Sequence, residues 1–265
     1  MSELNRRTFL HTATVAGVAA AGQTAAGSEA SSKPLLTDEE LAYLRRFDTP
    51  TISNALERQS LGNIHGRSRL EGFMTPTIRC IFPEMGITNG YAATVTIQAS
   101  KPRGDDQPYV SNTDYWEYID SIPKPTMMVI HDLDAPHPVG SWWGEVNANV
   151  HRALGCVGVV TDGGVRDLSV VRPLGFHFFA AEVLVSHAFV HLVNFGQPVN
   201  VGGVTISSGD LVQGDEHGVI QVPTSVAQQV GPTCYDVFKR ERALIELCQT
   251  PGVTLEKMKQ FVSRR

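Results

Sequence analysis

The hydrophobic and polar positions along this chain follow two periods, and together they predict an α/β protein. Apolar stretches rich in β-branched residues predict strands at residues 91–99, 127–130, 157–160, 176–181, 183–186, 201–206 and 211–222, the last split by the turn-rich residues 214–218. Capping signals and three- or four-residue apolar repeats predict helices from residue 37, at 51–58, 114–119 and 142–154, and from 224 onward with breaks at Pro232 and Pro251. The order of these elements predicts one α/β domain with a central mixed β-sheet, helices packed around it and a helical C-terminal tail.

Residues 127–167 form the most informative part of this pattern, because they predict a βαβ unit. Asp162, Gly163 and Gly164 predict a turn that ends its second strand, and Arg166 and Asp167 follow that turn. The helix would begin, and the second strand would end, at the same carboxyl edge of the sheet, where ligands bind in open α/β sheets. We therefore expect the start of the helix to lie close to Arg166 and Asp167.

The residue types at this edge suit a 2-oxo acid and a metal ion. The free amides of a helix N-terminus favour an anion, and Gly144 lets a ligand approach the backbone. Arg166 can bind an oxygen, Asp167 can hold a hard cation such as Mg²⁺, and Glu145 can hold one of its waters. Two plainer interpretations stay open: Arg166 and Asp167 can form a surface salt bridge, and Asp162 can either brace the turn or line the site.

Several neighbouring side chains have a structural and a functional interpretation. We expect the apolar stripe of the 142–154 helix to be buried, so that Trp142 lies in the core and Trp143 can face the ligand. The stripe consists of Trp142, Val146, Val150 and Leu154. His131, His137 and His217 lie near the predicted loops, but their spacing matches no compact zinc pattern, which favours structural or solvated roles.

The C-terminal helix carries one charge on an otherwise apolar stripe. The stripe consists of Val226, Val230, Cys234, Val237, Glu241, Leu244 and Cys248. A carboxylate on such a stripe needs a partner, because its burial alone is unfavourable. Glu241 therefore either assists an active site across a subunit interface or forms an ion pair with a nearby Lys or Arg.

Composition narrows the class of protein. With 265 residues and 42% hydrophobic content, the chain can bury a sizeable core. Its net charge of −5 argues against broad nucleic-acid binding, which requires a basic face. No apolar run reaches the length of a transmembrane helix. The 4 cysteines show no CxxC spacing, so a zinc knuckle is not expected.

The N-terminal residues differ in composition from the rest. Arg6 and Arg7 precede Phe9 and Leu10, and an Ala/Gly-rich run follows. We interpret residues 1–30 as a twin-arginine signal peptide, which implies export to the periplasm. The alternative is an amphipathic N-terminal helix on a cytoplasmic protein. We assign residues 36–260 to the folded domain.

The stretch GCVGVVTDGGVRD, residues 155–167, resembles the GxxGxxxDGxxRD signature of the RraA-like family. This family contains 4-hydroxy-4-methyl-2-oxoglutarate aldolases and the ribonuclease E regulator. Residues 47–56, 143–145 and 201–223 resemble further segments of the family more weakly. The resemblance implies a single α/β/α domain with a central mixed β-sheet of the swivelling β/β/α type.

The resemblance also implies roles for individual residues. The backbone at Gly144, Glu145, Val146 and Asn147 would bind the substrate carboxylate, and Arg166 would contact its keto oxygen. Asp167 would ligate Mg²⁺ or Mn²⁺, and Glu145 would orient a metal-bound water. Glu241 and Asp162 are candidates for supporting positions around this site.

By resemblance, the reaction is a class II, metal-dependent retro-aldol cleavage of 4-hydroxy-2-oxo acids to pyruvate, and oxaloacetate decarboxylation would use the same site. The chain would form homotrimers, or hexamers of paired trimers, with sites at the interfaces. Two alternatives remain: a non-catalytic protein-binding regulator of the ribonuclease-regulator type, and a lyase that acts on a different 2-oxo or sugar acid.

Overall fold

The computed structural model describes residues 35–58, 71–105 and 107–263, so the predicted signal segment lies outside the described residues. The helices and 3₁₀ turns are α1 (Asp38–Leu44), α2 (Thr49–Leu56), η2 (Pro83–Met85), α3 (Asn112–Ser121), α4 (Glu145–Ala153), α5 (Leu168–Val171), η3 (Arg172–Leu174), α6 (Ala227–Gln249) and α7 (Leu255–Ser263). The strands are β1 (Arg79–Cys80), β2 (Thr88–Gln98), β3 (Thr126–Asp132), β4 (Cys156–Val165), β5 (His177–Val183), β6 (His191–Phe195), β7 (Val199–Val201), β8 (Val204–Ile206), β9 (Leu211–Asp215) and β10 (Gly218–Val222).

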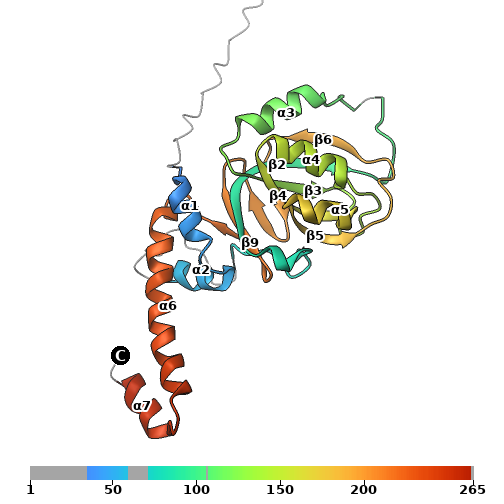
Figure 1. Ribbon diagram of the computed structural model, residues 1–265. Coiled ribbons are helices and arrows are strands. Elements are labelled where there is room, and N and C mark those ends of the chain that lie inside the picture. Colours follow the sequence, from blue (N-terminus) through green and yellow to red (C-terminus); the bar gives the residue numbers. More distant parts are fainter. Residues whose placement is uncertain (1–34, 59–70, 106, 264–265) are drawn as a thin grey trace, which may run out of the picture. The chain divides into compact units, whose positions relative to one another are not determined.

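Eight strands form a central mixed β-sheet, as the sequence predicts, and β7 and β8 form a separate two-stranded sheet (Figure 1). Its order is β1-β5-β4-β3-β2-β9-β10, with β6 paired to the second half of β2. The four strands β2 to β5 are parallel, and the outer strands are antiparallel to their neighbours. Phe73, in the segment before β1, bridges to Ile220 of β10, so the sheet nearly closes on itself.

The two faces of the sheet pack against different elements. On one face, Val159 and Val165 of β4 belong to a core shared with α1, α2, α3, α4 and α6. On the other face, Val160 of β4 packs in a second core with Val201 and Val204 of the β7–β8 hairpin. Successive side chains of a strand point to opposite faces, so β4 contributes to both cores. Side chains at the ends of the same strands therefore lie next to the helices on one face and next to the β7–β8 hairpin on the other.

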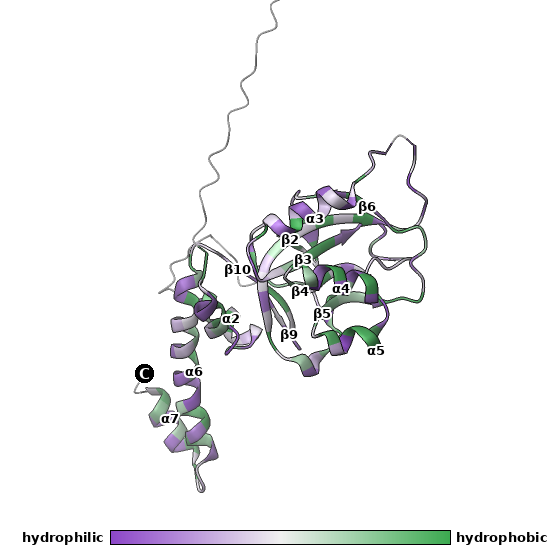
Figure 2. Cartoon of the chain, turned by 45° about the horizontal axis from the view of Figure 1, so that its top comes forward, coloured by the Kyte–Doolittle hydropathy of each residue, from purple (hydrophilic) through white to green (hydrophobic). Residues whose placement is uncertain are grey.

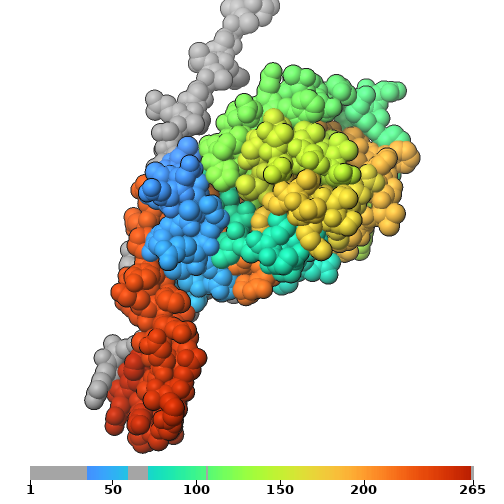
Figure 3. All heavy atoms as spheres, in the orientation of Figure 1, coloured from blue at the N-terminus to red at the C-terminus, as the bar shows by residue number. Residues whose placement is uncertain are grey.

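The N-terminal helices pack against the first half of α6 (Figure 3). Thr37 and Glu40 form the capping box that the sequence predicts for α1. Thr49, at the start of α2, donates from its amide and its hydroxyl to the buried carboxylate of Asp215 in β9, at 2.6 and 2.8 Å. This pairing ties α2 to the sheet.

Only the first half of the predicted apolar stripe on α6 is buried. Val226, Val230, Cys234 and Val237 are buried, whereas Glu241 and Cys248 are exposed. Hydrophobic and hydrophilic residues are interspersed along both α6 and α7 (Figure 2). Among the described residues, no helix combines the length and hydropathy required to span a membrane.

Several predicted boundaries are wrong. Pro50 lies in the first turn of α2 instead of preceding it, and α6 continues through Pro232. The single strand predicted at 201–206 is the β7–β8 hairpin, which turns at Gly202 and Gly203, both with positive φ. The strand predicted at 183–186 does not form, because β5 already ends at Val183.

Candidate active site

The loop that precedes α4 lies beside the end of β4. Trp143 forms a parallel bridge with Val165, and the Arg166 amide donates to the Trp143 carbonyl at 3.0 Å. The hydroxyl of buried Ser141 lies 2.7 Å from the carbonyl oxygens of both Trp143 and Gly164, and it accepts from the Trp143 amide at 3.1 Å. Ser141 therefore links the loop to the strand. The sequence pattern does not predict a role for Ser141, because a lone serine in a loop carries no distinctive signal.

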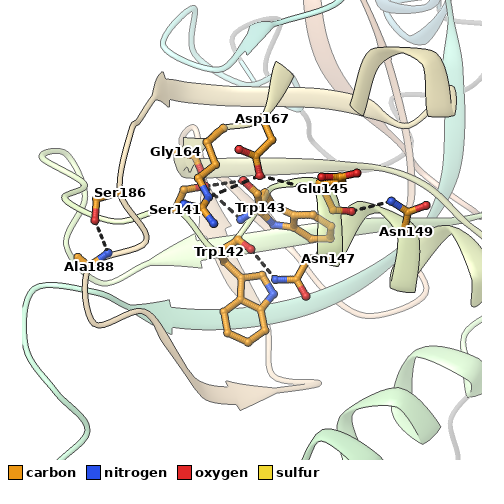
Figure 4. Close-up of polar contacts among 11 residues, drawn as sticks. Ser141, Trp142, Trp143, Glu145, Asn147, Asn149, Gly164, Asp167, Ser186 and Ala188 are labelled. Carbon is orange, nitrogen blue, oxygen red and sulfur yellow. Dashed lines mark hydrogen bonds and ion pairs between the residues drawn. The ribbon is translucent and has the colours of Figure 1, made fainter. Parts of the chain in front are cut away.

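Asp167 follows β4 in a left-handed backbone conformation, with φ 59° and ψ 35°. Its Oδ2 accepts a hydrogen bond from the Glu145 amide at 3.0 Å (Figure 4). The same oxygen lies 3.7 Å from Nε of Arg166. A Cβ on Gly144 would collide with this same carboxylate oxygen. A non-glycine residue in the left-handed region is strained, and such strain is concentrated at functional sites.

The fold thus brings the predicted residues Gly144, Glu145, Arg166 and Asp167 together at one edge of the sheet. The Glu145 backbone was expected to bind the substrate carboxylate, but its amide donates a hydrogen bond to Asp167 instead. The first intrahelical bond of α4 runs from the Ala148 amide to the Gly144 carbonyl. The amides of the first helical turn at Val146 and Asn147 therefore lack intrahelical acceptors and can receive an anion.

The apolar stripe predicted for the helix at 142–154 is wrong. The helix begins only at Glu145, and Val146 is 75% exposed. Trp143 is fully buried and stacks on Phe176 with ring centroids 5.4 Å apart, whereas Trp142 is half-buried. The prediction that Trp143 faces the ligand is therefore wrong, whereas Trp142 packs against the same core but is only partly buried. The physical reason is that this segment is extended beside β4, where alternate residues, not every fourth, share a face.

The turn predicted at Asp162 is also wrong. β4 continues to Val165, and a register shift against β5 falls between Thr161 and Gly164. Asp162 instead binds the neighbouring strand: Oδ2 lies 2.7 Å from Nδ1 of His131, and Oδ1 accepts from the Asp132 amide at 2.7 Å. A bulge keeps the strand paired while the chain bends, so two glycines do not require a turn here.

Two groups beside this edge have shifted pKa values. Burial raises the pKa of Asp132 to about 6, and its Oδ2 has no hydrogen-bond partner among the described residues. The hydrogen bond that His131 donates to Asp162 raises the pKa of His131, and burial opposes this effect. The histidines near the loops form no cluster with other ligands: within the described ranges, no three His, Cys, Asp or Glu side chains converge on a metal position.

Asp167 nevertheless suits a hard divalent cation. One of its oxygens is held by the Glu145 amide, and the side chain is partly exposed. Mg²⁺ commonly binds through one or two carboxylates and retains several waters, so it does not require a cage of three protein ligands. Glu145 is exposed next to Asp167 and can hold such a water. The donor set fits Mg²⁺ or Mn²⁺ better than Zn²⁺, which favours nitrogen and sulfur ligands.

Glu241 lies on α6, where its Oε1 accepts a hydrogen bond from the Asn54 amide group of α2 at 3.3 Å. This partner is neutral, and within the described ranges no Lys or Arg forms the alternative ion pair with Glu241. An assisting role across a subunit interface stays a prediction.

Comparison with known proteins identifies the family. A model of the RraA-like family, described as Aldolase/RraA, matches residues 49–221. A protein of Halalkalibacterium halodurans named "Putative 4-hydroxy-4-methyl-2-oxoglutarate aldolase" is 31% identical over 120 residues, which cover 43% of this chain and 57% of that protein. The chain thus spans only part of this curated relative.

Solved structures share the fold. A crystal structure of an uncharacterized protein from Pseudomonas syringae pv. tomato superposes with a TM-score of 0.66 at 26% identity, covering 86% of this chain and 96% of that one. RraAS2 of Streptomyces coelicolor, described as an unusual member of the RNase ES inhibitor RraA protein family, gives a TM-score of 0.61 at 22% identity, covering 79% and 96%. With the signature at 155–167 and the family model over most of the sheet, the chain belongs to the RraA-like family.

Proposed function

We propose that this chain is a divalent-metal-dependent lyase that cleaves 4-hydroxy-2-oxo acids, such as 4-hydroxy-4-methyl-2-oxoglutarate, to pyruvate. Oxaloacetate decarboxylation would be a second activity of the same site. The observation that carries the proposal is the left-handed Asp167, whose carboxylate is held against the Glu145 amide, beside Arg166 and over Gly144. The name of the Halalkalibacterium relative supports the same reaction class.

The chain's own residues account for substrate binding. The substrate carboxylate would bind the first-turn amides of Val146 and Asn147, where the helix dipole favours negative charge. The guanidinium of Arg166 would contact the keto oxygen. When the C3–C4 bond breaks, its electron pair moves toward that oxygen, so Arg166 would stabilise charge that is larger in the transition state than in the substrate.

Asp167 would hold Mg²⁺ or Mn²⁺, with Glu145 on one of the waters. The metal ion would supply Lewis-acid polarisation of the keto group when bound. Gly144 leaves the space that Asp167 occupies, because any side chain there would displace the carboxylate. The strained backbone of Asp167 is consistent with a position that is retained for function.

The experiment is to measure pyruvate release from 4-hydroxy-4-methyl-2-oxoglutarate and from oxaloacetate by the full chain, with Mg²⁺, with Mn²⁺ and with a chelator. We expect turnover to depend on the metal ion. Asp167→Asn and Arg166→Met should each lower this turnover by at least about a hundredfold. Arg152→Ala, an exposed change at the other end of α4, is the matched control.

Two outcomes would contradict the proposal. Full activity of Asp167→Asn would remove Asp167 from the reaction. An absence of turnover on both substrates, with a folded protein and added metal, would favour a different 2-oxo or sugar acid, or a non-catalytic protein-binding regulator. A metal-independent protein partner recovered by pulldown would support the regulator.

The proposal extends to assembly and location. The chain would form a trimer or a hexamer, with Glu241 of one subunit assisting the Asp167 site of the next. Mixing subunits of two inactive variants, Glu241→Gln and Asp167→Asn, should then restore part of the activity, and no recovery would place Glu241 outside the neighbouring site.

Residues 1–30 would direct export by the twin-arginine route, and replacing Arg6 and Arg7 by lysine should retain the protein in the cytoplasm.

A further inference from the structure

A cavity with both polar and apolar lining lies on the face of the sheet opposite α4. Its volume is about 680 Å³, within the usual range for small-molecule sites. It is lined by residues at the carboxyl ends of β3, β4 and β5, by the segment around β1, and by the β7–β8 hairpin. Asp162 points to this side because it is two positions beyond Val160, which packs in the hairpin core.

His131 and Asp162 form the polar centre of the cavity wall. Nδ1 of His131 lies 2.7 Å from Oδ2 of Asp162, and the Asp162 side chain is only 16% exposed. Both oxygens of Asp162 have partners, since Oδ1 accepts from the Asp132 amide. Because Asp162 engages Nδ1, the other ring nitrogen, Nε2, is left to face a ligand, and it can accept a proton or donate one.

Arg79 and Glu182 bring charges to the same cavity. Nη2 of Arg79 donates to the Ala181 carbonyl at 2.7 Å and lies 4.0 Å from Glu182. These contacts use only part of the guanidinium, which has five donors in total. A guanidinium presents two parallel donors that match a carboxylate, so Arg79 suits the acid group of a ligand.

We propose that this cavity is a second ligand site, which takes a small carboxylate that also carries a hydroxyl group. Arg79 binds the carboxylate, and Nε2 of His131 binds the hydroxyl. Asp162 is a positioning residue that holds the imidazole ring. The site is distinct from Arg166 and Asp167, because it opens on the opposite face of β4, and it does not depend on aldolase chemistry.

The test is calorimetric titration of the full chain carrying Arg166→Met, which weakens ligand binding at the first site. Glycerate is the probe, and propionate and glycerol lack the hydroxyl groups and the carboxylate, respectively. We expect glycerate to bind more tightly than both. His131→Asn and Arg79→Met should each weaken its binding by about tenfold. His137→Asn, an exposed histidine on the neighbouring loop, should leave binding unchanged.

NMR of the wild-type chain provides a second test that needs no folded variant. The imidazole signals of His131 should shift when glycerate is added. Asp162→Asn should lower the pKa of His131, since the hydrogen bond that the ring donates to the Asp162 carboxylate raises it. Unchanged His131 signals at saturating glycerate, or equal affinities with and without His131, would overturn the assignment. Glycerate binding that only Arg166→Met weakens would place the ligand at the first site.

Discussion

Asp167 and Glu145 are 22 residues apart in the chain, yet Oδ2 of Asp167 accepts a hydrogen bond from the Glu145 amide at 3.0 Å. This contact joins the end of β4 to the start of α4, so it places the carboxylate at the positive end of the helix dipole. The close approach is feasible because Gly144 lies under the carboxylate without a side chain.

Gly144→Ala should lower activity without unfolding the protein. The added Cβ would collide with Oδ2 of Asp167 and would come within 3.2 Å of Nε of Arg166. A displacement of about 1 Å in a reacting group can reduce turnover roughly a hundredfold, and we expect a loss of that order. Pyruvate release and thermal unfolding of the same sample measure both effects. Wild-type turnover by Gly144→Ala would show that the carboxylate position is not critical.

Comparing Asp167→Gly with Asp167→Ala should isolate the backbone strain at this position. Both variants lose the carboxylate and should be inactive. Glycine accepts a φ of 59° without penalty, whereas alanine does not. We expect urea unfolding to show Asp167→Ala less stable than Asp167→Gly by about 1 kcal/mol. Equal stabilities would indicate that the backbone relaxes out of the left-handed region when the carboxylate is removed.

Ser141→Ala should loosen the loop that carries Gly144. The hydroxyl contacts the carbonyl oxygens of Trp143 and Gly164 and the amide of Trp143, and all of these groups are buried. Removing it leaves polar backbone groups without a partner, at a cost of about 1–3 kcal/mol. Denaturant unfolding should show this loss, together with reduced turnover. Ser121→Ala, at the exposed end of α3, is the control and should change neither quantity.

Asp132→Asn should stabilise the protein at neutral pH and not at acidic pH. Burial raises the pKa of Asp132 from 3.8 to about 6, so the folded state favours the protonated acid. Its contribution to stability is therefore present below pH 4 and is lost as the pH rises through about 6. The asparagine variant avoids this loss, so its free energy of unfolding should exceed that of the wild type by about 1–3 kcal/mol at pH 7 to 8. Unfolding curves of both proteins between pH 4 and 8 test this prediction. A constant difference in unfolding free energy across that range would contradict the raised pKa of Asp132.

Local signals in the chain are sufficient for the fold class and for much of the site. The capping box at Thr37, the apolar strands that become β2, β3 and β4, and the proximity of Gly144 to Arg166 and Asp167 all follow from short-range patterns. These features are predictable because a cap, a strand period and a βαβ crossover each depend on a few neighbouring residues.

The remaining features depend on contacts between distant segments. Trp143 is buried because residues 141–144 run beside β4, and nothing in the local sequence distinguishes that extended segment from the first turn of a helix. Asp162 faces His131 because a bulge continues β4 past the two glycines. Strand pairing and packing determine which face each of these side chains takes, so only the tertiary structure could decide them.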